Sequence, residues 1–110
     1  MDSLAVITAL KALDGLSQRS IVTAENIANA GTANYRPSRV TFEAALSAAA
    51  ARGGDAVRDL QPIIERSDQP ELRLDLEMAT ASSTQLRYAA LIEVLNRQLQ
   101  LHALAIKGTL

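Results

Sequence analysis

Apolar residues recur every three or four positions over the N-terminal quarter of the chain. This spacing is that of one face of an α-helix, so the pattern predicts an N-terminal helix over residues 1–30. Asp2 or Ser3 can cap its start. Gly15 interrupts the pattern and indicates a bend or a close approach of another segment. The apolar positions are Leu4, Ile7, Leu10, Leu13, Leu16, Ile21, Ala24, Ile27 and Ala28.

A second and more regular apolar pattern predicts a C-terminal helix over residues 75–108. Alternating spacings of four and three residues are typical of helices that pair as a coiled coil, and Leu13 and Leu16 are the matching positions of the first helix. Asp75 is expected to cap the start and Gly108 to end the helix. The seam consists of Tyr88, Ile92, Leu95, Leu99, His102 and Ile106, and it is widened by Leu91, Val94, Leu101 and Leu104. With so many aliphatic positions, this helix needs partners on more than one side.

Between the two helices, residues 31–42 predict a turn. A helix that arrives through Ile27 can close with a left-handed residue near Gly31, and Pro37 then holds the chain extended. The cluster from Val40 to Phe42 is strand-like, and Phe42, the only phenylalanine, is expected to pack against the first helix.

Residues 43–74 form a short middle segment with weaker signals. The alanine-rich stretch 43–52 predicts a short helix or an ill-ordered one, and two glycines then break it. Charges and two prolines in residues 55–74 predict a loop. Short extended pieces are expected near residues 63–64 and 72–74.

Composition narrows the fold class. Apolar residues make up 48% of the chain, yet it has one Phe, two Tyr and no Trp, so much of that fraction is alanine, which suits helices and narrow seams better than a globular core. We therefore expect one all-α unit over residues 1–110, in which long N- and C-terminal helices pair as a coiled coil. Eleven basic against twelve acidic residues give no basic face for nucleic acid, and the absence of cysteine excludes disulfides and thiolate metal sites.

The end of the first helix carries a specific motif. Asn26-Ile27-Ala28-Asn29 is followed by Thr32 and by Tyr35 with a basic neighbour. This motif resembles the N-terminal signature of flagellar basal-body rod proteins, the rod/hook family of axial subunits. The family usually has proline and glycine where this chain has Ala33 and Asn34. Asn34 can still adopt the left-handed conformation, whereas Ala33 lacks the fixed φ of proline.

A second motif lies at the start of the last helix and resembles the C-terminal signature of the same family. It runs over residues 74–78 and 85–88 and contains Asp75, Glu77 and Tyr88. The short middle segment and this wording are most similar to the B type of the proximal rod, with the C type as the alternative.

The resemblance implies a structural role. A rod subunit self-assembles through its terminal helices into the axial drive shaft that motility needs. Its partners would be other rod subunits, the membrane-ring/rod adaptor protein and the flagellar type III export apparatus, which would deliver it to the periplasmic rod of the basal body without a cleaved signal peptide. Asn26, Ile27, Asn29, Thr32 and Tyr35 would then fix the turn, and no cofactor or metal is implied.

Two other classes of function are an adaptor or chaperone and an enzyme. A helical-hairpin adaptor or export chaperone, acting as a soluble dimer, would share the apolar seams without needing the Asn26 motif. An enzyme finds no set of residues to support it, because Asp75 and Glu77 point in different directions on a helix and His102, the only histidine, has no second ligand for a metal. No uncharged apolar run reaches the roughly 18 residues of a membrane span, so direct membrane insertion is not expected.

Overall fold

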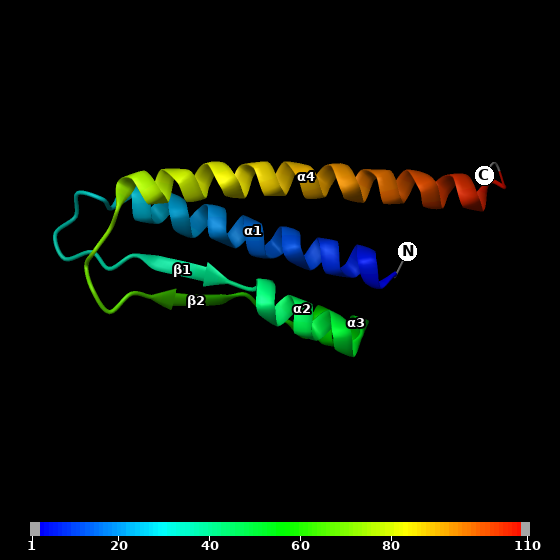
Figure 1. Ribbon diagram of the computed structural model, residues 1–110, viewed down its shortest axis with the longest axis horizontal. Helices are drawn as coiled ribbons and strands as arrows, with labels where there is room; N and C mark the ends of the chain where they lie inside the picture. Colours follow the sequence, from blue (N-terminus) through cyan, green and yellow to red (C-terminus); the bar gives the residue numbers. More distant parts are fainter. Residues whose placement is uncertain (1–2, 109–110) are drawn as a thin grey trace.

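The computed structural model describes residues 3–108, which are mostly helical. In chain order its elements are α1 (Leu4–Ala28), β1 (Ser38–Thr41), α2 (Glu43–Arg52), α3 (Gly54–Asp59), β2 (Ile63–Arg66) and α4 (Leu74–Ile106). Helix α1 is the central element: α4 lies along one side of it, and the two strands with α2 and α3 lie on the other (Figure 1). The long terminal helices are as expected, whereas the small sheet corrects the purely helical class.

The molecule is strongly elongated. Its principal extents are 61 × 26 × 14 Å and its radius of gyration is 17.2 Å, compared with about 13 Å for a compact domain of this length. Helix α4 is about 50 Å long and α1 about 38 Å at 1.5 Å per residue, so the C-terminal end of α4 projects past the start of α1 (Figure 1). Every residue from 100 to 108 is exposed.

The start of α1 follows the sequence, but its end does not. The Ser3 hydroxyl accepts a hydrogen bond from the Val6 N–H at 3.2 Å, whereas Asp2 lies outside the described residues. The expected left-handed residue near Gly31 was wrong: between α1 and β1 only Asn34 has a positive φ, of 62°. The helix closes without one because the Asn29 side-chain amide donates to a terminal carbonyl, that of Glu25, at 2.9 Å.

The two strands form an antiparallel two-stranded sheet, with α2 and α3 in the connection between them. Ser38 is paired with Arg66 and Thr41 with Ile63. Residues of β1 alternate between buried and exposed, since one face of this strand packs on α1, while β2 is exposed throughout. The strand-like cluster near Val40 and the extended piece at residues 63–64 are confirmed. Of the extended piece expected near residues 72–74, Arg73 has an extended backbone, whereas Leu74 already begins α4.

Helix α3 was not expected from the sequence. Gly53, with φ 115°, does end α2, but a new helix starts at the next residue because this places Val57, which is fully buried, in the core. The cap expected at Asp75 was also wrong. Arg73 is the N-cap of α4 and makes no side-chain cap bond; Asp75 lies inside the first turn, where an acidic residue favours the positive end of the helix dipole.

Phe42 is the centre of the small hydrophobic core. Its side chain is buried and packs directly on Gly15 of α1, so that a Cβ atom added at Gly15 would lie 2.5 Å from the ring. Gly15 is therefore a site of close approach. The buried core residues are Leu16, Val22, Val40, Phe42, Leu46, Ala49 and Val57.

Replacing Gly15 with alanine is expected to destabilise the fold. Overpacking of this kind costs about 1–3 kcal/mol, and the gain of about 1 kcal/mol in helix propensity offsets only part of that cost. The unfolding midpoint in urea should therefore fall. Gly31→Ala is the matched control, because an added Cβ there meets no atom within 4 Å. Equal midpoints for the two variants would contradict the close packing of Phe42.

Candidate assembly interface

Asn26, near the end of α1, connects this helix to the start of α4. It is completely buried, and its side chain makes four hydrogen bonds. The Oδ1 atom accepts from the Ser38 N–H at 3.0 Å and from the Tyr35 hydroxyl at 3.2 Å. The Nδ2 atom donates to the Ser38 carbonyl at 2.9 Å and to Glu77 Oε2 at 3.0 Å. One side chain thus connects α1, the turn, β1 and the first turn of α4.

Glu77 is the partner of Asn26 on α4, and it is almost completely buried. An isolated carboxylate in such a position would be strongly unfavourable. Here Oε1 forms an ion pair with Arg39 at 2.6 Å while Oε2 accepts from Asn26, so both oxygens have a charged or polar donor. We call this arrangement of Asn26, Glu77 and Arg39 the clamp. It joins residues that are 51 positions apart in the sequence.

The other turn residues predicted from the sequence form a local hydrogen-bonded network. The Thr32 hydroxyl donates to Asn29 Oδ1 at 3.1 Å, and the Tyr35 N–H donates to the Thr32 carbonyl at 3.2 Å. Ile27 is half-buried beside them. Asn34 takes a positive φ of 62°, so the turn closes with alanine at position 33 and asparagine at position 34.

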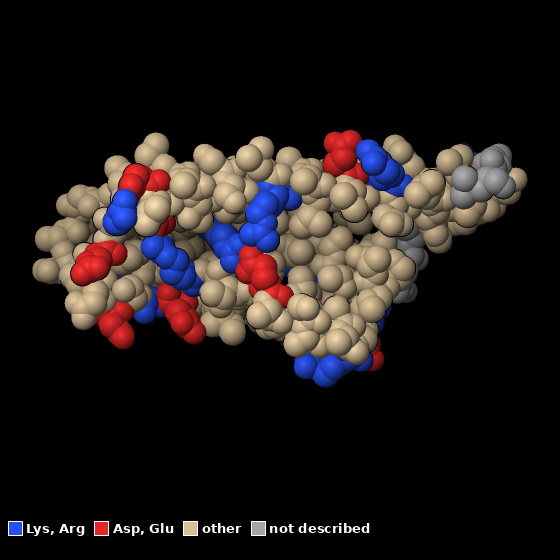
Figure 2. All heavy atoms as spheres, viewed as in Figure 1, with Lys and Arg blue, Asp and Glu red and all other residues tan. Residues whose placement is uncertain are grey.

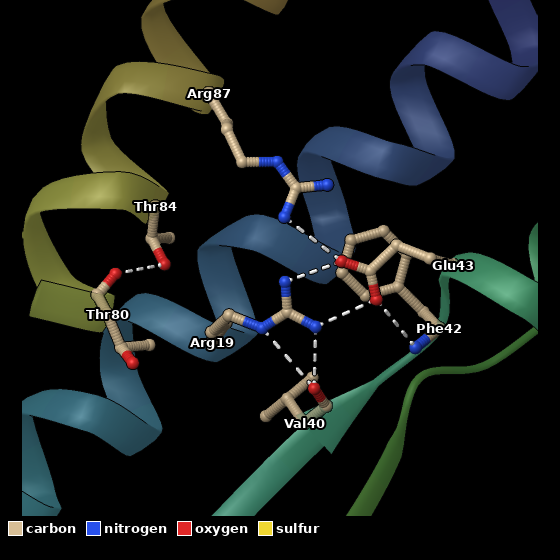
Figure 3. Close-up of polar contacts among 7 residues, drawn as sticks. All are labelled: Arg19, Val40, Phe42, Glu43, Thr80, Thr84 and Arg87. Carbon is tan, nitrogen blue, oxygen red and sulfur yellow. Dashed lines mark hydrogen bonds and ion pairs between the residues drawn. The ribbon is translucent and has the colours of Figure 1, made fainter. Parts of the chain in front are cut away.

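A second group of polar contacts, which the sequence did not predict, lies near the middle of α1 (Figure 3). We call this group, formed by Arg19, Glu43, Arg87 and the Val40 carbonyl, the polar node. The Arg19 guanidinium donates to both Glu43 oxygens, at 2.6 and 2.8 Å, and to the Val40 carbonyl, at 2.7 Å from Nη2. It also lies 4.9 Å from the centre of the Phe42 ring, within the range of a cation–π contact. Arg87 of α4 reaches the same Glu43 carboxylate at 3.2 Å. The node therefore ties α4 to α1 and to the start of α2.

These contacts change the acidity of Glu43. Hydrogen bonds from Arg19 lower the pKa of the Glu43 carboxyl from 4.5 to about 2, although partial burial opposes the shift. A lowered pKa in the folded state means that the ionised carboxylate contributes stability above pH 4.5, and that this contribution is lost as the pH falls from about 4.5 to 2.

We therefore expect Glu43→Gln to lower the melting temperature most at neutral pH and progressively less towards pH 3. Between about pH 4.5 and 2, Glu43 is protonated in the unfolded wild-type chain while it is still ionised in the folded one, and this proton uptake favours unfolding. Melting curves followed by circular dichroism at a series of pH values measure this. Gln18→Ala, an exposed neutral change on α1, is the control and should have the same effect at each pH. A Glu43→Gln effect that is constant with pH would contradict the assigned role of the carboxylate.

The predicted seam is covered unevenly in the single chain. Leu13 and Leu16 of α1 are buried, and Ile92, Leu95 and Leu99 of α4 are half-buried. Tyr88, His102 and Ile106 are exposed, and for Ile106 the exposed fraction reaches 73%. The α1–α4 packing within one chain thus covers the middle of the seam, and an interhelical contact at Ile106 stays a prediction for assembled protein.

Helix α4 also presents apolar residues on the side away from this seam. Leu86, Ala90, Val94 and Leu101 lie within about 80° of one another around a helix of 3.6 residues per turn, and we call this surface the outer face. Arg97, which is paired with Glu93, lies within the same arc. Leu86, Val94 and Leu101 are 73%, 54% and 46% exposed. Figure 2 shows one acidic and one basic group side by side on the C-terminal half of α4, surrounded by uncharged atoms. Several exposed apolar side chains grouped on one side of a helix are typical of a surface that binds another protein.

The comparisons with known proteins add no relative. A scan of the chain against protein-family models finds no match, and a search of the curated proteins finds none either. Over residues 3–108, no helix is both long enough and apolar enough to cross a membrane. The same part of the chain contains no group of three or more potential metal ligands. What it offers are two packing features, the clamp and the outer face of α4.

Proposed function

We propose that the chain is a structural subunit of the bacterial flagellar basal-body rod, of the B type of the proximal rod. The observation that carries the proposal is the outer face of α4, which continues into an exposed C-terminal end on an elongated molecule. The clamp gives further support. Asn26 belongs to the first sequence motif and Glu77 to the second, and the two side chains are hydrogen-bonded in the structure.

The exposed apolar residues of α4 can supply the free energy for self-assembly. Burying one Leu or Val side chain contributes about 1.5–3 kcal/mol, and the outer face leaves such groups in contact with water. A neighbouring copy that covered Leu86, Val94 and Leu101 would gain this free energy in a tube of parallel subunits. In that tube we propose that the α1 and α4 helices pair as a coiled coil, in which Ile106 also becomes buried.

The proposed role also defines the partners and the place of the protein. These are other rod subunits, the membrane-ring/rod adaptor protein and the flagellar type III export apparatus, and the location is the periplasmic rod of the basal body. The role is mechanical: it requires no catalytic residue, cofactor, nucleic acid or membrane insertion.

A soluble dimeric adaptor or export chaperone is the second candidate, since one partner could also cover the outer face. Sedimentation velocity over a wide range of protein concentrations separates the two. A rod subunit should pass from monomer to open-ended polymers as the concentration rises. A discrete dimer at every concentration would favour the adaptor, and a monomer at every concentration would contradict self-assembly altogether.

A further inference from the structure

A groove of about 690 Å³ separates α4 from β1 and is bordered by three arginines. Arg39 lies on the β1 side, Arg87 on the α4 side and Arg19 at the bottom. Exposed Ser83 also lines the groove. Figure 2 shows basic groups gathered at the middle of this face, where the surface is hollowed between α4 and the strands.

The groove carries an excess of positive charge. Three guanidinium groups meet two carboxylates, those of Glu43 and Glu77. The Arg39 and Arg87 side chains are 55% and 50% exposed, so each retains donors that are directed to solvent. A guanidinium has five N–H donors and binds carboxylates well. The groove is thus suited to an acidic segment.

The chain itself contains such a segment at one end of the molecule. The loop between β2 and α4 (Figure 1) carries Asp68 and Glu71, which are exposed and, within residues 3–108, have no ion pair. Residues 67–73 are neither helix nor strand, so this loop can approach a groove as a single segment of chain. The other exposed acidic residues that have no ion pair within residues 3–108 lie in helices or in a strand: Asp14 and Glu25 in α1, Asp59 in α3 and Glu65 in β2.

We propose that the loop of residues 67–72 from a second copy of the chain docks in this groove, with Asp68 and Glu71 bound to Arg39 and Arg87. The inference rests on the proposed function, because it names one contact through which the subunits associate. Groove and loop are different surfaces of one chain, so the contact is head-to-tail. Contacts of this type generate open helical assemblies when the rotation does not close a ring.

Disulfide trapping tests the contact, because the chain contains no cysteine of its own. Two full-length variants, Ser83→Cys in the groove and Gln69→Cys in the loop, are mixed under mild oxidation. We expect a mixed disulfide dimer to form at least fivefold faster than in the control mixture. The control pairs Gln69→Cys with Ala24→Cys, an exposed position on α1.

Exchanging the charges of the two surfaces then tests whether acidic residues of the loop bind arginines of the groove. Arg87→Glu in the Ser83→Cys chain should slow the mixed disulfide severalfold, and Asp68→Lys with Glu71→Lys in the Gln69→Cys chain should restore it, which a merely misfolded variant could not show. A higher salt concentration should slow formation of the mixed disulfide between the Ser83→Cys and Gln69→Cys chains that carry no charge exchange.

The outcomes distinguish the inference from the proposed function. Open-ended polymers without preferential trapping of the loop in the groove would overturn the inference and leave the rod role standing. A chain that stays monomeric at every concentration would overturn both.

Discussion

Replacing Asn26 with leucine is expected to lower the free energy of unfolding by about 3 kcal/mol or more, because it leaves several buried polar groups without partners at once. Leucine has the same branching at Cγ as asparagine but neither donates nor accepts, and its larger methyl groups add an overpacking cost at this completely buried position. The Ser38 N–H and carbonyl, the Tyr35 hydroxyl and one Glu77 oxygen would all lose their bond to Asn26. Urea unfolding followed by circular dichroism measures the change.

Asn29→Ala serves as the comparison for this variant. Asn29 lies on the same motif, but its side chain bonds only to neighbouring residues, Glu25 and Thr32, and the loss of such bonds costs about 1 kcal/mol each or less. We expect the loss in the free energy of unfolding to be clearly larger for Asn26→Leu than for Asn29→Ala. Similar losses at both positions would mean that the clamp does not hold α4 to the rest of the chain.

Placing a charge on the outer face should prevent assembly while leaving the monomer folded. We expect Val94→Asp with Leu101→Asp to weaken self-association by about 100-fold or more, since each 1.4 kcal/mol is a factor of ten and an unpaired buried carboxylate costs several kcal/mol. Both residues are about half exposed in the single chain, so its melting temperature should change little.

Leu99→Asp is the matched variant on the opposite side of α4. Leu99 is half-buried, so the same change should lower the melting temperature as well as block incorporation into basal bodies. Both variants should be expressed, and both should abolish motility. Normal motility of cells that carry Val94→Asp with Leu101→Asp would show that the outer face has no role in assembly.

The terminal helices could be predicted because helical periodicity is a local property of the sequence. Most of the site could not, because it depends on contacts between distant segments. The pattern shows that Asn26 ends a helix and that Glu77 lies near the start of another, but only the fold places the two within 3.0 Å of each other. The sequence predicted that α4 packs against partners on more than one side. In the single chain its outer face stays exposed to solvent.

The departures from the predicted local structure have equally specific causes. A helix of six residues such as α3 is too short for periodicity to reveal, and it forms because Val57 is buried against the core. A single arginine on an amphipathic helix gives no sign that it will become a polar node. Arg19 does so only because β1 brings the Val40 carbonyl and Glu43 to it.

The central claim, that this chain builds the base of the flagellar rod, is tested most directly by imaging basal bodies from cells that lack it. We expect membrane rings from which the proximal rod is missing, with the rod restored when the wild-type chain is supplied and not restored by Val94→Asp with Leu101→Asp. Complete rods in the deletion strain would contradict it.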